Sequence, residues 1–207
     1  MRIRFATVAS AGLAAFLIAI AAGRLGAFPE PALVNPSWEL DVTWEKPRTI
    51  GVEGLDGRTS WYWYLPYKIV NQSKSEQLFV PETTIATDQG NIITAGKGVP
   101  PDVFPAIKQL LGNPLLEHPL QVSGRILIGE DHAKESVAIW PVFAGDVDEM
   151  SIFITGLSGE TQTIKHPITG EDIPLRKTCR LVYHTPGTGA NPQRQSIKRR
   201  TKDWVMR

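Results

Sequence analysis

The segment Ser60-Trp61-Tyr62-Trp63-Tyr64-Leu65-Pro66-Tyr67-Lys68-Ile69-Val70 carries the clearest strand pattern in this 207-residue chain. Side chains alternate between the two faces of a strand, so one face carries Trp61, Trp63, Leu65, Tyr67 and Ile69, and the other carries Tyr62, Tyr64, Lys68 and Val70. Aromatic and β-branched side chains fit the pleated surface of a sheet. Pro66 has no backbone donor, which indicates a sheet edge or a bulge at that position. The segment predicts a long strand with two apolar faces.

Shorter strand patterns flank this segment and are separated by turns rich in glycine, proline and asparagine. They cover residues 38–44, 78–87, 92–94, 123–128, 136–143, 150–155, 161–166, 176–184 and 204–206. Short strands spaced by roughly 8–12 residues with such punctuation are typical of a sandwich of two sheets. Residues 161–166 and 176–184 have the arrangement of hairpin partners around a turn at 167–170. The chain is therefore predicted to be mostly β.

One short helix is predicted at residues 102–111. Asp102 is a suitable N-cap, Pro105 lies in the first turn, and Gly112 can end the helix. An apolar stripe at helical spacing is formed by Val103, Phe104, Ile107, Leu110 and Leu111. We expect this stripe to pack against one end of the sheets.

Several of these segments resemble a known class of domain. The run Trp63-Tyr64-Leu65-Pro66-Tyr67-Lys68-Ile69-Val70-Asn71, with Phe79-Val80-Pro81 and Thr87-Asp88-Gln89-Gly90 after it, is similar to the opening of exported bacterial immunoglobulin-like domains of uncharacterised function. The later segments 139–143, 146–148 and 154–158 also look like those domains. The resemblance covers residues 60–185 and implies an immunoglobulin-like sandwich. It implies almost nothing about activity, because the similar positions are turns and core residues.

The N-terminal residues indicate export. Arg2 and Arg4 precede an uncharged, apolar stretch at residues 5–23, which as a helix would span roughly 28 Å, about one hydrocarbon thickness. Basic residues ahead of an apolar run are typical of a secretory signal. The segment is either a cleaved signal peptide or a retained anchor helix. The domain is thus expected outside the cytoplasm, either free in the periplasm or medium, or held at the inner membrane by residues 5–23.

The chain divides by composition into four parts. They are a signal peptide or membrane anchor at 1–27, a linker and first strand at 28–59, a β-sandwich domain at 60–190 and a basic tail at 191–207. Residues 28–190 hold 13 basic and 20 acidic residues, a net charge of −7, whereas the tail has a net charge of +5. Its Lys198-Arg199-Arg200-Thr201-Lys202 run either binds an envelope protein or an anionic polymer or lipid, or stays solvated or docked on the acidic body. Nucleic acid is not an expected partner of an exported domain.

Isolated residues with chemical potential have simpler structural explanations. Cys179, the only cysteine, lies in an alternating apolar segment and is predicted to be a small buried side chain. The aromatic stretch 61–64 either stacks sugars or fills the sandwich core on one face and packs under the helix or the 45–60 loop on the other, and we favour the core. Asn71-Gln72-Ser73 is a glycosylation sequon, meaningful only in a host that glycosylates exported proteins. No paired spacing that predicts a zinc site is shown by His118, His132, His166 and His184.

These features favour a non-catalytic interaction or structural module of the cell envelope, with no predicted catalytic residue, cofactor site or metal site. Two alternatives stay open. A hydrolase would use Asp131, His132 and Ser158, provided that the fold brings them together. A calcium-stabilised domain would use the carboxylates of one acidic loop, namely Asp146, Asp148 and Glu149.

Overall fold

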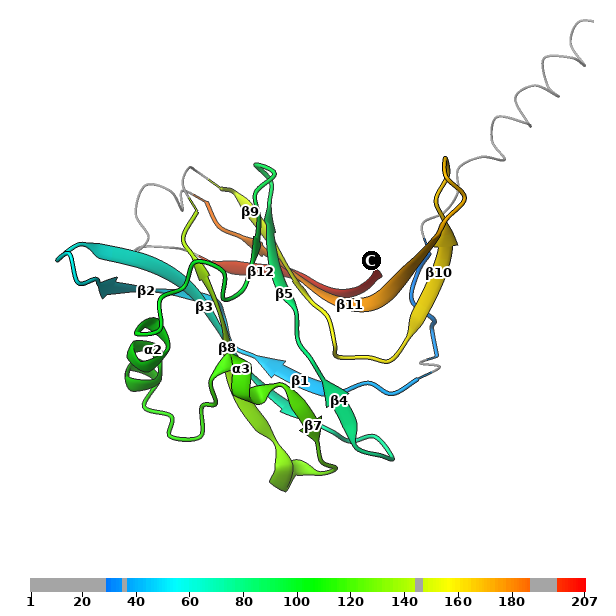
Figure 1. The fold of residues 1–207 in the computed structure, drawn as a ribbon, viewed down its shortest axis with the longest axis horizontal. Helices are drawn as coiled ribbons and strands as arrows, with labels where there is room; N and C mark the ends of the chain where they lie inside the picture. Colours follow the sequence, from blue (N-terminus) through cyan, green and yellow to red (C-terminus); the bar gives the residue numbers. More distant parts are fainter. Residues whose placement is uncertain (1–28, 35–36, 144–146, 187–196) are drawn as a thin grey trace, which may run out of the picture. The chain divides into compact units, whose positions relative to one another are not determined.

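A computed structural model describes residues 29–34, 37–143, 147–186 and 197–207 (Figure 1). The chain divides into two compact units, Met1–Glu30 and Pro31–Arg207. The predicted signal or anchor segment lies outside the described residues. Within the described ranges, no helix is long and apolar enough to cross a membrane.

The second unit is mostly β, as predicted. Its strands are β1 (Asp41–Trp44), β2 (Arg48–Glu53), β3 (Thr59–Val70), β4 (Gln77–Phe79), β5 (Thr83–Thr87), β6 (Ile92–Thr94), β7 (Gly124–Ile126), β8 (Lys134–Pro141), β9 (Glu149–Ile154), β10 (Thr161–Lys165), β11 (Asp172–His184) and β12 (Lys198–Met206). Its helical segments are α2 (Val103–Leu111), α3 (Pro119–Val122) and the 3-10 turn η1 (Glu130–His132). All of the strand pairs between these elements are antiparallel.

The first sheet is built around β3, the aromatic strand. Strand β8 pairs with one edge of β3, and β1 and β2 share the other edge. Trp44 lies opposite Tyr67 and Arg48 lies opposite Tyr64, so the β1–β2 side carries one extra residue, a bulge. Glu45 N donates to Pro66 O at 3.0 Å, so the missing donor of Pro66 faces this bulge. The bulge explains how a central strand accommodates a proline.

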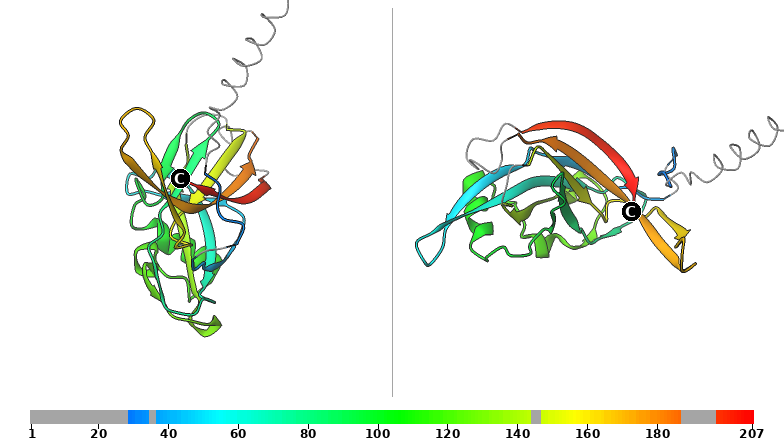
Figure 2. Two further views of the ribbon diagram at one scale, coloured as in Figure 1. Left: turned by 90° about the vertical axis from the view of Figure 1, so that its right-hand side faces the viewer. Right: turned by 90° about the horizontal axis from the view of Figure 1, so that it is seen from above.

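The second sheet has the order β10-β11-β9-β5-β6, with β12 on the other edge of β11. The predicted hairpin is confirmed, because β10 pairs with residues 172–176 of β11. The rest of β11 pairs with β9 on one side and with β12 on the other, and Figure 2 shows β11 and β12 running side by side. The last strand is longer than the predicted segment 204–206, since it begins at Lys198. Strands β4 and β7 form a separate small ladder.

Two hydrophobic clusters cover both faces of β3. Trp63 and Leu65 pack with Ile152 and Leu181 in the core shared by the two large sheets. On the opposite face, Tyr62 and Tyr64 belong to a second cluster, which includes Val103 and Ile107 of α2. The predicted two-faced strand is therefore confirmed. Three of the four rings in the stretch 61–64 are buried, and Trp61 is half-buried, so this stretch forms no open platform for stacking sugars.

Helix α2 follows Asp102 and ends at Gly112, which has the left-handed φ of 60° that favours glycine. Asp102 makes no side-chain capping hydrogen bond, which differs from the prediction. Leu110 is 59% exposed, so the apolar stripe is narrower than predicted. The helix packs on the outer face of the β3–β8 sheet rather than at one end of the sheets, because its buried residues join the cluster on that face. The short helix α3 was not predicted from the sequence. Its N-cap is His118, whose side chain accepts a hydrogen bond from Leu120 N.

Candidate interaction surface

The basic C-terminal segment forms β12, an edge strand of the second sheet. Arg176 and Arg207 exchange both of their backbone hydrogen bonds, at 2.7 and 3.2 Å. Bonded and non-bonded pairs alternate along an antiparallel ladder, so the backbone groups of Asp203 and Val205 face β11. The backbone groups of Lys202 and Trp204 consequently face away from the sheet. One edge of β12 is therefore unpaired among the residues that the structure describes.

Specific contacts hold this charged strand in place. Arg180 on β11 makes two hydrogen bonds to the Asp203 carboxylate, Nε–Oδ1 at 3.0 Å and Nη2–Oδ2 at 2.5 Å. These hydrogen bonds raise the pKa of Arg180. Arg200 pairs with Glu149 on β9 at 2.6 Å, and Trp204 packs against the shared core. Residues 198–206 are therefore docked on the body of the domain as a strand, and binding of the basic run to an envelope partner stays a prediction.

Strand β1 also has an edge that no other described strand pairs with. Glu45 N bonds to Pro66 O, so by the same alternation the backbone groups of Val42 and Trp44 face away from β3. Just before β1, Leu40 N bonds to Leu157 O at 2.8 Å, so the chain passes from the second sheet to the first at this point. Val42 and Trp44 pack partly against the shared core.

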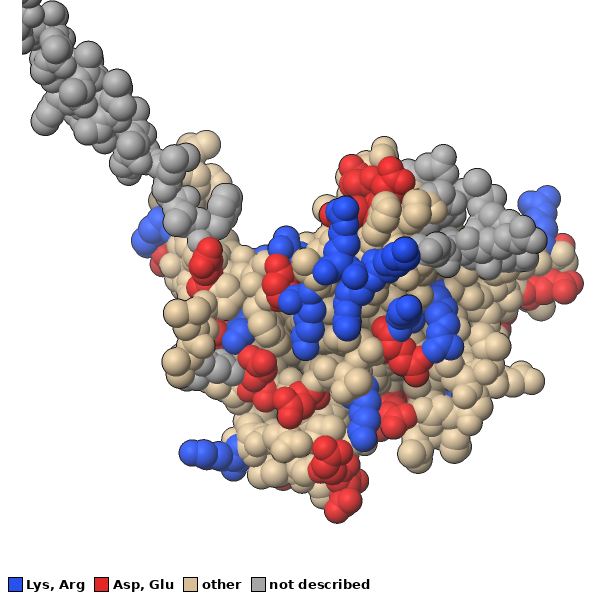
Figure 3. Space-filling view, turned by 180° about the vertical axis from the view of Figure 1, so that it is seen from behind, with Lys and Arg blue, Asp and Glu red and all other residues tan. Residues whose placement is uncertain are grey.

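A slot of about 390 Å³ is lined by all four residues of β1 and by Lys202 and Trp204 of β12. We call it the edge slot, and the residues that line it include Val42, Trp44, Lys68, Glu130, Lys202 and Trp204. Trp44 and Trp204 are half-buried, and the Lys202 ammonium lies 5.4 Å from the ring centroid of Trp44. On the face of the molecule seen from behind, several Lys and Arg side chains form a group near the middle of the surface (Figure 3). On β12 the exposed cations are Lys198, Arg199, Arg200 and Lys202.

A buried ion cluster supports one end of the edge slot. Lys177 Nζ lies 2.9 Å from Glu39 Oε2 and 3.3 Å from Glu160 Oε2, and the side chains of Lys177 and Glu160 are only 5% and 2% exposed. Burial lowers the pKa of Lys177, but hydrogen bonds and charges from the two carboxylates outweigh burial, and the pKa is raised. Lys177 Nζ also lies 5.0 Å from the centroid of the Trp204 ring. The cluster ties the segment before β1 to β11 and β12.

The structure does not connect the three residues of the predicted hydrolase. Asp131 and His132 lie on η1, whereas Ser158 lies between β9 and β10. Ser158 Oγ accepts a hydrogen bond from Glu160 N at 3.2 Å. No hydrogen bond of the described residues joins Ser158 to His132 or Asp131.

The acidic loop is described only in part, because Asp146 lies outside the described residues. Glu149 pairs with Arg200, and Asp148 N donates to Asp88 Oδ2 at 3.3 Å. Among the residues that the structure describes, no group of three or more His, Cys, Asp and Glu side chains is placed to hold a metal ion.

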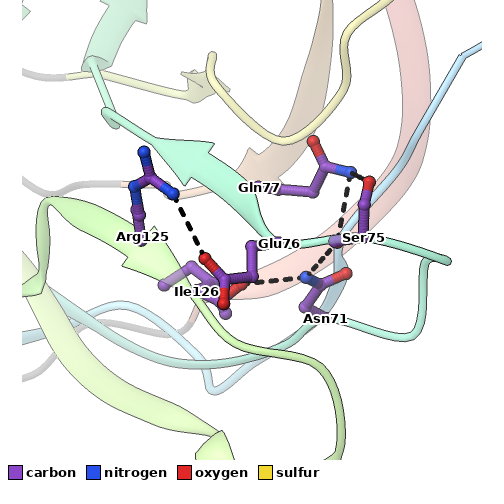
Figure 4. A network of polar contacts seen from close by, with 6 residues as sticks. All are labelled: Asn71, Ser75, Glu76, Gln77, Arg125 and Ile126. Atoms are coloured by element: carbon purple, nitrogen blue, oxygen red, sulfur yellow. Dashed lines mark hydrogen bonds and ion pairs between the residues drawn. The ribbon is translucent and has the colours of Figure 1, made fainter.

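Asn71 of the sequon is buried and has a structural role. Its side-chain nitrogen donates to Ser75 O and Ile126 O, both at 2.9 Å, which ties the end of β3 to β7 (Figure 4). Ser73 Oγ donates to Asn71 Oδ1 at 2.7 Å, and Gln77 extends the network to Ser75. The folded domain therefore hides the nitrogen to which a glycan would be attached.

Cys179 and three of the histidines also have structural roles. Cys179 is buried in the shared core, and burial raises the pKa of its thiol to about 12, so it is not a reactive thiolate. His118 and His166 accept backbone hydrogen bonds, and His184 Nδ1 lies 3.1 Å from Asp148 O. These residues stabilise turns and strand ends.

Sequence reasoning missed the edge slot, because its walls come from residues 42–44 and 202–204, which are far apart in the chain. The available signal was the pair of isolated tryptophans, Trp44 and Trp204, in short amphipathic segments near the two ends of the domain. Comparison with known proteins found no matching family model, no matching curated protein and no matching solved structure.

Proposed function

We propose that this chain is a non-catalytic interaction module of the cell envelope that holds a partner in the edge slot. The proposal assigns it an immunoglobulin-like sandwich, exported or anchored through its N-terminal segment. Two antiparallel sheets that share one core are compatible with that assignment, as is the resemblance of residues 60–185.

One observation carries the proposal: within the described residues β1 and β12 each have an unpaired edge, and residues of both strands line the same slot. Unpaired edges are ready-made templates for association, and proteins that do not use them usually cover them. Half-buried Trp44 and Trp204 add apolar surface within the slot. Tryptophan of this kind is enriched at binding interfaces.

Site-specific photo-crosslinking in cells that produce the full chain tests the proposal. A photoreactive residue replaces Thr43, an exposed position on β1 that lines the slot. The matched control replaces Thr163, an exposed threonine on β10. We expect a discrete adduct from position 43 and none from position 163. Equal labelling from both positions, or no adduct from position 43, would contradict the proposal.

A second candidate function is contact with an anionic membrane surface. Lys198 and Arg199 are exposed on β12 and make no ion pair within the described ranges. Each basic residue close to an anionic lipid surface contributes about 1 kcal/mol to binding. Changing both residues to glutamine should weaken binding to vesicles that contain phosphatidylglycerol, whereas the same changes at exposed Lys74 and Lys97 should not. Equal effects of the two double variants would exclude this function.

A further inference from the structure

We infer that the edge slot binds an extended polypeptide segment, which adds as a strand beside β1 and β12 and places a carboxylate against Lys202. The inference rests on the proposed function and specifies the chemical class of its ligand.

The backbone of the slot provides the first argument. Within the described part of the chain, no hydrogen bond is made by the backbone N–H of Val42 or Trp44 on β1, or of Lys202 or Trp204 on β12. These groups point away from their own sheets. An extended polypeptide is the ligand that satisfies such a row of alternating donors and acceptors. A compact ligand would satisfy only part of the row.

The charges of the slot give the second argument. The cations among its lining residues are Lys68 and Lys202, and Lys68 lies 3.6 Å from Glu130. The lining carboxylate of Glu39 lies 2.9 Å from Lys177, which is not a lining residue. Lys202 makes no ion pair within the described residues, and its ammonium lies over the Trp44 ring. Lys202 is therefore the lining cation that can pair with a carboxylate of a ligand.

The acidic residue Asp41 also lines the slot, but it occupies a different face of β1. Side chains alternate along the strand, so Asp41 and Thr43 lie opposite to Val42 and Trp44. A ligand strand beside β1 would present alternate side chains in the same way. Those on the core side meet Trp44, Trp204 and Lys202, which suits apolar residues and one acidic residue.

A second copy of this chain is a poor occupant. Pairing β12 with β12 of another copy about the basic run would bring Lys198, Arg199 and Lys202 of each strand close to the same cations of the other. Like charges across neighbouring strands are destabilising, and charged edge strands oppose association of this kind. The charges that disfavour self-pairing favour an acidic partner strand.

Peptide titration tests the strand geometry. The probe is an eight-residue peptide in which threonine alternates with valine and one valine is replaced by glutamate. Two further versions carry methyl groups on the backbone nitrogens of either the threonines or the valine and glutamate residues. A strand pairs through defined edges, so at least one methylated version should lose binding while the sequence and charge stay the same. Binding of both methylated versions at the affinity of the parent, or no binding of the parent, would overturn the inference.

Two substitutions at one position separate strand pairing from charge. Lys202→Pro removes the outward N–H and the charge, but no hydrogen bond to β11, because that N–H faces away from β11. Lys202→Gln removes only the charge. We expect the proline variant to bind the probe about fivefold more weakly than the glutamine variant, as for the loss of one hydrogen bond. Equal binding by two folded variants would contradict strand addition, and the methylated peptides decide the matter if the proline variant does not fold.

The two proposals fail in different ways. An adduct from position 43 without any binding of the strand probes would keep the edge slot as the binding surface and reject a polypeptide strand as its ligand. If position 43 gives no adduct but the parent peptide binds, the envelope partner is rejected, whereas binding of polypeptide strands in the slot is retained.

Discussion

Strands β3 and β12 are both long antiparallel strands, yet their surroundings are opposite. Strand β3 has neighbours on both edges and a hydrophobic cluster on each face. Strand β12 has β11 on one edge, nothing on the other within the described residues, and exposed cations along its first half. The comparison shows where the domain derives its stability and where it can bind. Its most aromatic strand is interior, and its most basic strand faces solvent.

The largest expected effect separates the tryptophans of these two strands. Trp63→Ala removes a ring with no exposed surface and should lower the free energy of unfolding by about 3–5 kcal/mol. Trp204→Ala removes a half-buried ring and should lower it by about 1–2 kcal/mol. Urea-induced unfolding measures both. Similar losses for the two variants would show that β12 is as much a part of the core as β3.

The next largest effect concerns the ion cluster under the slot. Lys177→Ala leaves the buried carboxylate of Glu160 without its cation and should cost about 3 kcal/mol. Lys165→Ala breaks an ion pair with Asp172 in which both side chains are largely exposed, so less than about 1 kcal/mol is expected. Thermal unfolding of the two variants is a direct comparison. A small effect of Lys177→Ala would mean that the cluster is open to water.

Substitutions in helix α2 measure how much its packing on the outer face of β3 contributes to stability. Ile107→Ala should lower stability by about 2–3 kcal/mol, because Ile107 is buried against Tyr62 and Tyr64. Leu110→Ala, one turn further along and 59% exposed, should change it by less than about 0.5 kcal/mol. Equal effects would place the helix elsewhere than on the β3–β8 sheet.

The Cys179 thiol, whose pKa is raised by burial, should have the smallest effect on stability at neutral pH, and its effect should appear only at alkaline pH. The folded chain keeps the Cys179 thiol protonated up to about pH 12, whereas the unfolded chain ionises near pH 9.0. A group whose pKa is raised on folding contributes its full stabilisation to the folded state at pH values below its unfolded pKa. For Cys179 this contribution is lost as the pH rises from 9.0 to about 12. The melting temperature should therefore begin to fall near pH 9 in the wild type. In Cys179→Ala the fall should begin nearer pH 10, where tyrosines such as Tyr67 ionise in the unfolded chain. An identical onset in both proteins would refute a buried thiol.

Much of the interior could be predicted from the sequence. The period-two alternation of residues 60–70 and, apart from exposed Leu110, the stripe of α2 gave correct faces, because burial of large apolar groups dominates local preference. The sequence predicted either a sheet edge or a bulge at Pro66, and the structure has a bulge opposite this residue. The partner that completes it, the β1–β2 segment, was not predicted.

The charged regions could not be predicted in the same way. Residues 198–202 contain no apolar alternation, and only pairing with β11 and contacts such as Arg180–Asp203 make them a strand. Glu39 alternates with apolar neighbours and looks like a solvated residue, but it binds Lys177, which lies 138 positions later in the chain. Long-range ion pairs leave no local periodicity, and the edge slot is bounded by elements that such contacts position.

Residue-resolved hydrogen exchange along β12 tests the central claim most directly. If residues 198–206 form a paired strand with one free edge, the amides of Asp203 and Val205 should be protected by their bonds to β11, and those of Lys202 and Trp204 should exchange quickly. Uniformly fast exchange would show a solvated tail. Uniform protection would show that the edge facing the slot is already covered, and either result would contradict the account.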